Sequence, residues 1–115
     1  MKIIIVDRHA SSAELLRMTL SSRGYPTIVV EDAKDGLAAV RAHWPDVVIL
    51  DHDVPGFPAG QFIKATRTIV PEVDILLLSE APNLAEIAQG LSVRHLPKPC
   101  HPAQVLGMLP AVARQ

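Results

Sequence analysis

The chain has 115 residues, 49% of them hydrophobic, which is enough for one domain with a single buried core. Its 11 basic and 12 acidic residues give a formal net charge of −1, so no overall field attracts nucleic acid or an anionic membrane surface. The single cysteine, Cys100, cannot form an internal disulfide, and no apolar run approaches the roughly twenty residues that cross a bilayer as a helix. We therefore expect one soluble, cytoplasmic domain over residues 1–115, with no direct nucleic-acid binding and no membrane contact.

Short apolar runs alternate along the chain with longer segments of helical periodicity. The runs are rich in Ile, Val and Leu and end in polar residues, as the strands of a parallel sheet do when helices cover both of its faces. This pattern predicts strands at 2–6, 27–30, 47–50, 74–78 and 93–96, and helices at 11–22, 33–43, 59–69, 84–90 and 102–113. The predicted fold class is therefore α/β, with a doubly wound five-stranded parallel sheet.

Helix-capping and helix-breaking residues agree with these boundaries. Ser11 or Ser12 can cap the first helix, and Gly24 can end it. Pro45 follows the second helix and Pro71 follows the third. No linker or internal repeat interrupts the alternation, so the chain reads as one continuous unit.

Polar side chains follow four of the predicted strands. Asp7 follows the first strand, Asp51 and Asp53 the third, Ser79 the fourth and Lys98 the fifth. Ligands of doubly wound sheets bind at these carboxyl ends. A carboxylate there can accept a phosphoryl group when an ammonium and a carboxylate-bound metal neutralise the developing charge and a hydroxyl bonds a phosphoryl oxygen. The combination predicts a phosphoryl-acceptor site.

The segment 45–56, with the sequence PDVVILDHDVPG, resembles the phosphorylation-site stretch of the receiver domains of bacterial two-component response regulators. The resemblance covers the full length of the chain. It implies a flavodoxin-like (βα)5 fold and a signalling module that is not an enzyme. It also implies that Asp51 accepts a phosphoryl group from a histidine kinase or a phosphotransfer protein in a phosphorelay, with regulation of transcription as the commonest output.

The same resemblance assigns roles to residues of the last two strands. Ser79 matches the switch hydroxyl, and Lys98 matches the lysine that stabilises the phosphoryl group. His95 stands where the family usually has an aromatic switch residue, and Pro99 is similar to the proline that often follows the lysine through a cis bond. The face formed by the fourth helix, the fifth strand and the fifth helix is then the expected surface for a partner or for homodimer formation.

The expected magnesium site is atypical. The resemblance implies that Asp7, Asp51 and the main-chain carbonyl of Asp53 are ligands of Mg²⁺, but Arg8 stands in place of the second acidic residue that the family usually carries. The charges of the carboxylates Asp7 and Asp51 and of the cations Arg8 and Lys98 then sum to zero. Because like charges about 4 Å apart repel by roughly 4 kcal/mol at an effective dielectric constant of 20, we expect weakened Mg²⁺ affinity.

Two smaller departures from the family pattern are also present. Glu80 occupies a position where the family prefers a small residue, and Ala59 replaces an aspartate that usually caps the third helix. The interval between Ser79 and Lys98 is short, which predicts a short or irregular fourth helix.

Two readings of the function remain open, with a third from another class. In the first, Asp51 is a phosphorylation site. In the second, the chain is a metal-independent pseudo-receiver in which Arg8 pairs with Asp51 and the domain acts as a protein-interaction module. The remote third reading is a cofactor-binding flavodoxin-like module, because residues 7–9 are similar to the Asp-x-His-x-x-Gly start of cobalamin-binding domains. Ser12 occupies the position of that glycine.

The histidines outside the switch position have no spacing typical of metal ligands. We expect surface or helix-capping roles for His9, His43, His52 and His101.

Overall fold

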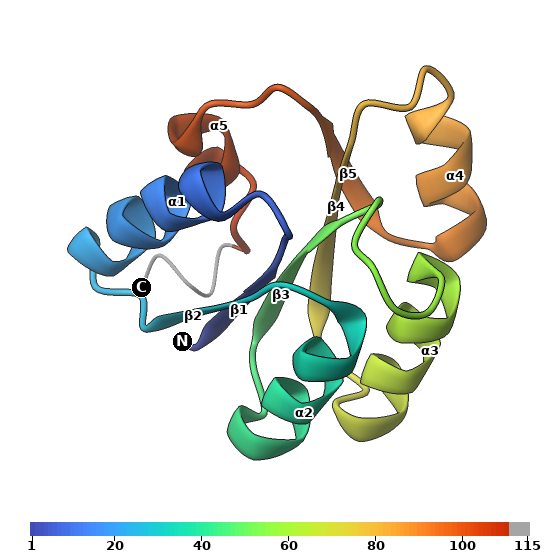
Figure 1. Ribbon diagram of the computed structural model, residues 1–115, viewed down its shortest axis with the longest axis horizontal. Helices are drawn as coiled ribbons and strands as arrows, with labels where there is room; N and C mark the ends of the chain where they lie inside the picture. Colours follow the sequence, from blue (N-terminus) through green and yellow to red (C-terminus); the bar gives the residue numbers. More distant parts are fainter. Residues whose placement is uncertain (111–115) are drawn as a thin grey trace.

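The computed structural model describes residues 1–110, in which five parallel strands form one sheet in the order β2-β1-β3-β4-β5 (Figure 1). The strands are β1 (Ile3–Val6), β2 (Thr27–Val30), β3 (Val47–Asp51), β4 (Asp74–Ser79) and β5 (Arg94–Pro97). The helices are α1 (Ala10–Ser22), α2 (Ala33–His43), α3 (Ala59–Ile69), α4 (Leu84–Leu91) and α5 (Pro102–Gly107). The predicted doubly wound α/β fold is confirmed, and α4 is short, as the spacing between Ser79 and Lys98 predicted.

The end of helix α5 and the cap of helix α1 differ from the prediction, whereas the other strand and helix ends agree to within one residue. Helix α5 ends at Gly107 instead of continuing, because glycine is a poor helix former and Pro110 cannot donate its backbone nitrogen to the carbonyl of Leu106; residues 111–113 of the predicted helix lie outside the described part. Helix α1 has His9 at its N-cap, without a side-chain cap hydrogen bond. Ser12 donates instead to the carbonyl of His9 at 3.1 Å, so the expected serine cap was wrong.

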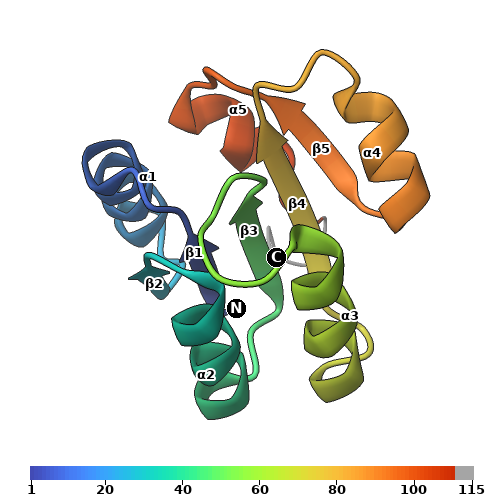
Figure 2. The same ribbon diagram turned by 45° about the vertical axis from the view of Figure 1, so that its right-hand side comes forward.

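The sheet is sandwiched between two layers of helices. Figure 1 and Figure 2 show α1 and α5 on one face and α2, α3 and α4 on the other. Alternate strand residues point to opposite faces, so Leu50 and Leu77 pack with Phe62 in one core cluster, while Ile49 packs with Leu20 in the other. Full burial of each side chain of this size stabilises the fold by roughly 1.5–3 kcal/mol. This two-sided core explains why the central strands are continuous apolar runs.

The direction in which successive strands are added to the sheet reverses between β1 and β3, since β2 lies on one side of β1 and β3 on the other. After β1 the chain turns to α1 on one face, and after β3 it passes to α3 on the other, so the switch point, where doubly wound sheets bind their ligands, lies between these two strands. The two strands are in parallel register, with Val6 beside Leu50. Asp7 and Asp51 therefore emerge side by side at the carboxyl edge of the sheet.

The loop after β3 is held by a close backbone approach. Gly56 has φ +110°, a conformation that side chains rarely adopt, and a Cβ there would lie 3.0 Å from the Cβ of Ala33. The Ala33 amide donates to the carbonyl of Pro55 at 2.9 Å, and Val54 is buried beneath the loop. These contacts fix the path of the segment that carries Asp53.

Within residues 1–110, no helix is long and apolar enough to span a membrane.

Candidate functional site

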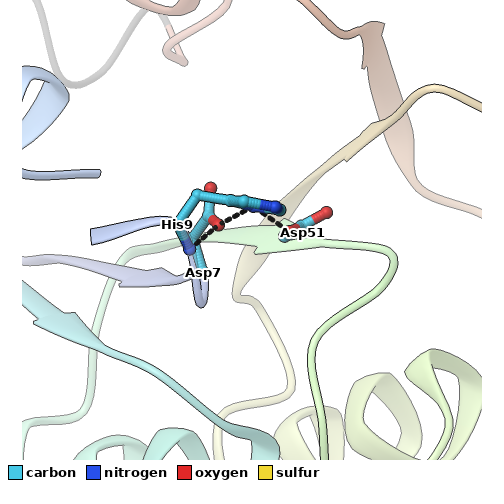
Figure 3. A group of neighbouring side chains, drawn as sticks. All are labelled: Asp7, His9 and Asp51. Atoms are coloured by element: carbon cyan, nitrogen blue, oxygen red, sulfur yellow. Dashed lines mark hydrogen bonds and ion pairs between the residues drawn. The ribbon is translucent and has the colours of Figure 1, made fainter. Parts of the chain in front are cut away.

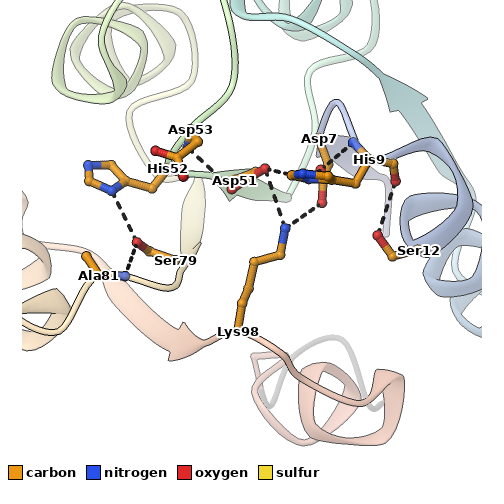
Figure 4. A network of polar contacts seen from close by, with 9 residues as sticks. All are labelled: Asp7, His9, Ser12, Asp51, His52, Asp53, Ser79, Ala81 and Lys98. Carbon is orange, nitrogen blue, oxygen red and sulfur yellow. Dashed lines mark hydrogen bonds and ion pairs between the residues drawn. The ribbon is translucent and has the colours of Figure 1, made fainter.

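Asp7 and Asp51 form the buried acidic centre of the site. They are 5% and 2% exposed, respectively, and both lie close to the ammonium of Lys98. Lys98 Nζ donates to Asp7 Oδ2 at 3.2 Å and lies 3.4 Å from Asp51 Oδ2 (Figure 4). Lys98 comes from the end of β5, where its backbone nitrogen donates to the carbonyl of Ser79 at 2.9 Å, and its peptide bond to Pro99 is cis. Three strand ends thus deliver two carboxylates and one cation to a single point.

His9 joins this centre, although the sequence predicted only a surface or capping role for it. The His9 amide donates to Asp7 Oδ1 at 2.8 Å, which folds the chain back so that the ring lies over the carboxylates. Its Nδ1 is 2.9 Å from Asp7 Oδ1 and 3.3 Å from Asp51 Oδ2 (Figure 3). The signal in the sequence was the Asp-x-His spacing, because an aspartate commonly bonds the backbone two residues later.

The environment separates the pKa values of the two carboxyl groups. Burial raises the pKa of Asp51 above its ordinary value, and the nearby charge of Asp7 raises it further. Burial also acts to raise the pKa of Asp7, but the His9 amide and the Lys98 charge outweigh it, and the pKa of Asp7 is lowered. Burial opposes the charged form of Lys98, yet the charges of Asp51 and Asp7 raise the pKa of its ammonium. The site therefore favours a charged Asp7–Lys98 pair, whereas it disfavours the ionised form of Asp51.

One oxygen of Asp51 has no hydrogen-bond partner. Asp51 Oδ1 accepts a hydrogen bond from the Asp53 amide at 3.3 Å, but the buried Oδ2 accepts none from residues 1–110. Its neighbours Lys98 and His9 approach to ion-pair distance without hydrogen-bonding geometry. Buried polar atoms are nearly always satisfied, so an unsatisfied carboxylate oxygen at the switch point of the sheet is a candidate ligand atom.

Arg8 does not enter the site. Its side chain is exposed and makes no hydrogen bond or ion pair with any residue between 1 and 110, so the proposed pairing of Arg8 with Asp51 is wrong. The reason is geometric, because successive residues leaving the strand point in different directions and the inward position belongs to Asp7. The charges that face one another are Asp7, Asp51 and Lys98, which sum to −1 instead of the expected zero.

Ser79 lies at the end of β4 and forms no side-chain hydrogen bond with Asp51. Its Oγ accepts a hydrogen bond from the Ala81 amide at 3.0 Å and lies 3.2 Å from His52 Nδ1 (Figure 4). The sequence assigned His52 a surface or capping role, whereas its ring is partly buried against the predicted switch hydroxyl. His101 does cap a helix, since its ring accepts the amide of Ala103 at the start of α5.

The other predicted residues lie around this centre. The exposed Glu80 lines a cavity of about 290 Å³ together with Asp7, His9 and Lys98, and the inner wall of that cavity is formed by apolar side chains of α1 and α5. His95 is partly exposed on β5, in register with Leu77, and faces the side of the sheet that carries α4. The structure therefore brings together Asp7, Asp51 and Lys98, with Ser79 nearby and His95 apart from them.

Comparisons with known proteins agree with this arrangement. The sequence profile described as "Response regulator receiver domain" matches residues 3–109. The "DNA-binding response regulator MtrA" of Mycobacterium tuberculosis is 30% identical over 117 residues, which cover 99% of this chain and 51% of that protein. The "Response regulator MprA" of Mycolicibacterium vanbaalenii is 27% identical, with 99% and 51% covered. The chain thus spans about half the length of the curated relatives it matches.

Solved structures show the same fold. The chemotaxis response regulator CheY4 of Vibrio cholerae is 25% identical with a TM-score of 0.84, over 98% of this chain and 96% of that one. A CheY-like receiver domain protein from Methanospirillum hungatei has a TM-score of 0.84 over 92% of this chain and 87% of that one. Its identity is 17%, so it supports the fold alone.

Proposed function

The chain belongs to the response regulator receiver domain family, and from this membership we propose that it accepts a phosphoryl group on Asp51 and transmits the change to a partner or an output domain. Receiver domains of response regulators are signalling modules of two-component systems. The phosphoryl donor is then a histidine kinase or a phosphotransfer protein, and the domain switches its partner without turning over a metabolite.

The observation that carries the proposal is the unsatisfied Asp51 carboxylate beside Lys98. A carboxylate is a better nucleophile when it is poorly solvated, and Asp51 is 2% exposed with one oxygen that accepts no hydrogen bond from the described residues. In the transfer, an Asp51 oxygen forms a bond to phosphorus while the bond from phosphorus to the donor's imidazole nitrogen breaks. Lys98, 3.4 Å from Asp51 Oδ2, offsets the charge that develops on the phosphoryl oxygens.

The acidic residues fit a divalent cation. Asp7 and Asp51 offer carboxylate oxygens, the net charge of the centre is −1, and Oδ2 of Asp51 accepts no hydrogen bond from the described residues and can serve as a ligand atom. We propose that these two residues, with the main-chain carbonyl of Asp53, hold Mg²⁺ with lower affinity than a site with a second acidic residue. When bound, the ion adds positive charge beside the transferred group.

Transmission is assigned to Ser79 and His95. Ser79 would bond a phosphoryl oxygen after leaving its contact with His52, and the rearrangement would reach His95 on the neighbouring β5. The face of α4, β5 and α5 then binds the partner or a second copy. Relatives described as DNA-binding suggest an output on DNA, carried outside this domain.

A second candidate is a pseudo-receiver that works without phosphorylation. It is favoured by one observation, because Lys98 and His9 already lie within ion-pair distance of both carboxylates. In that case protein contact alone would set the output, and Arg8 would take no part in it.

Intact-protein mass measurement after incubation with phosphoramidate and Mg²⁺ tests the main proposal. We expect one added phosphoryl group in the wild type and none in Asp51→Asn. Asp53→Asn is the matched control, because its side chain is exposed two residues away, and it should still be labelled. Labelling of Asp51→Asn would contradict the assignment, whereas no labelling of the wild type at any Mg²⁺ concentration would favour the pseudo-receiver.

A further inference from the structure

Three potential ligand atoms from Asp7, His9 and Asp51 converge at the switch point of the sheet. One nitrogen and two carboxylate oxygens all lie within 4.8 Å of one another. Figure 3 shows the imidazole ring of His9 lying across the space between the two carboxylates. The cluster contains a nitrogen donor that a magnesium site does not require.

The two distances from His9 Nδ1 to the carboxylate oxygens are those of neighbouring ligands around one ion. His9 Nδ1 is 2.9 Å from Asp7 Oδ1 and 3.3 Å from Asp51 Oδ2. Ligands bound to one ion at 2.0–2.1 Å are separated by about 3.0 Å in octahedral geometry and about 3.3 Å in tetrahedral geometry. An ion could therefore be bound with small side-chain adjustments.

The orphaned oxygen of Asp51 is independent evidence for a ligand here. Asp51 Oδ2 is fully buried and accepts no hydrogen bond from the described residues, although it faces His9. The two oxygens of Asp7 have different partners. Oδ2 accepts a hydrogen bond from Lys98, and Oδ1 faces the imidazole of His9. The hydrogen bond of the ammonium thus goes to the Asp7 oxygen that is not a proposed ligand, while Lys98 Nζ lies 3.4 Å from Asp51 Oδ2.

The donor set discriminates between cations. Mg²⁺ prefers oxygen ligands and keeps much of its water, whereas imidazole nitrogen binds first-row transition ions far better. A set of one imidazole and two carboxylates is suited to ions from Mn²⁺ to Zn²⁺. Lys98 is the cation that faces the two carboxylates, the three groups together carry a charge of −1, and the Arg8 side chain is exposed, so the centre still attracts a divalent ion.

We propose that His9 replaces the missing second acidic ligand and makes this centre a site for a first-row transition-metal ion, in preference to Mg²⁺. Asp7 Oδ1, His9 Nδ1 and Asp51 Oδ2 are its protein ligands. The adjacent cavity, lined by Asp7, His9 and Glu80, gives the ion access from solvent. The inference concerns the choice of metal, and it stands whether or not Asp51 is phosphorylated.

Calorimetric titration of untagged, metal-free protein with Zn²⁺, Mn²⁺ and Mg²⁺, without a phosphoryl donor, tests this choice. We expect one site whose Zn²⁺ affinity exceeds its Mg²⁺ affinity at least about a hundredfold. His9→Ala should lower Zn²⁺ affinity at least about tenfold and change Mg²⁺ affinity less than about threefold. Because the His9 side chain is 54% exposed, this variant should keep the fold, which thermal unfolding can verify.

Three further variants locate the site. His101→Ala removes a histidine outside the cluster and Cys100→Ser removes the only thiol, so both should bind Zn²⁺ like the wild type. Asp51→Asn should lose affinity along with His9→Ala. Unchanged Zn²⁺ affinity in His9→Ala, or loss of affinity in either control, would overturn the proposal. Absence of phosphorylation in the separate mass experiment would leave it intact.

Discussion

His52 Nδ1 lies 3.2 Å from the Oγ of Ser79, so the hydroxyl at the end of β4 is engaged by the residue that follows Asp51. The Ala81 amide donates to the same oxygen at 3.0 Å. A phosphoryl group on Asp51 would compete with these contacts for Ser79. The contact between His52 and Ser79 would therefore have to be given up for Ser79 to bond the phosphoryl group.

Removing this contact should favour the phosphorylated conformation. We expect His52→Ala to lose its phosphoryl group more slowly than the wild type, by about twofold to fivefold, because one hydrogen bond contributes about 0.5–1.5 kcal/mol. The decay of the labelled protein, followed by intact mass, measures the effect. His43→Ala, a substitution on α2, is the control, and equal decay in His52→Ala and wild type would remove His52 from the switch.

The raised pKa of Asp51 predicts a pH-dependent effect of Asp51→Asn. A carboxyl group whose pKa is raised by burial costs the folded state stability once it ionises, and this cost is absent below its ordinary value of 3.8. In metal-free buffer at about pH 7, we expect Asp51→Asn to melt a few degrees above the wild type. Thermal unfolding across pH should show this advantage shrinking as the solution is acidified, and an advantage that persists at about pH 3 would contradict the prediction.

Lys98 should stabilise the fold through its two carboxylate partners. The pKa of its ammonium is raised, so its contribution is fully present at neutral pH and is lost as pH rises through the folded-state pKa. We expect Lys98→Met to cost about 2–3 kcal/mol at pH 7, because two carboxylates are left without their ammonium. Urea unfolding measures it, and Lys64→Met, at an exposed position on α3, should change stability by under about 0.5 kcal/mol.

Substitutions of Arg8 separate the effect of its charge from the effect of a missing ligand. Arg8→Asp should raise Mg²⁺ affinity at least about tenfold, since a carboxylate oxygen beside Asp7 adds a ligand. Because the Arg8 side chain is exposed and unpaired among residues 1–110, Arg8→Ala should raise it by less than about threefold. Thermal shift with increasing Mg²⁺ compares the three proteins, and an equal gain in both variants would show that repulsion dominates.

His95 is the residue to test for partner binding. It is partly exposed on the edge strand β5, so His95→Ala should lower stability by about 1 kcal/mol or less. We expect it to weaken self-association or kinase-dependent partner binding at least about fivefold, as measured by analytical ultracentrifugation or a pull-down with the phosphorylated protein. Unchanged association would place the output face elsewhere, and Thr68→Ala on α3 is the surface control.

The local pattern of apolar and polar residues predicted the order of strands and helices in this protein. The apolar runs before Asp7, Asp51 and Ser79 determine strands that are buried on both faces, and helical spacing between them implies parallel strands and therefore a common carboxyl edge. The convergence of Asp7, Asp51 and Lys98 follows from that topology. It could be predicted because each of them comes at or directly after the end of a strand.

Side-chain direction beyond the strand ends was decided by the tertiary structure. Arg8 and His9 are adjacent in the sequence, but the hydrogen bond from the His9 amide to Asp7 turns the imidazole inward while the guanidinium is exposed. His52 likewise meets Ser79 only because β3 and β4 are neighbours in the sheet. The sequence by itself determined which strand ends carry the chemistry, because strand period and apolar runs are local. Only the folded chain decided that His9 and not Arg8 faces Asp51, because that choice depends on a turn and on contacts between residues far apart in the chain.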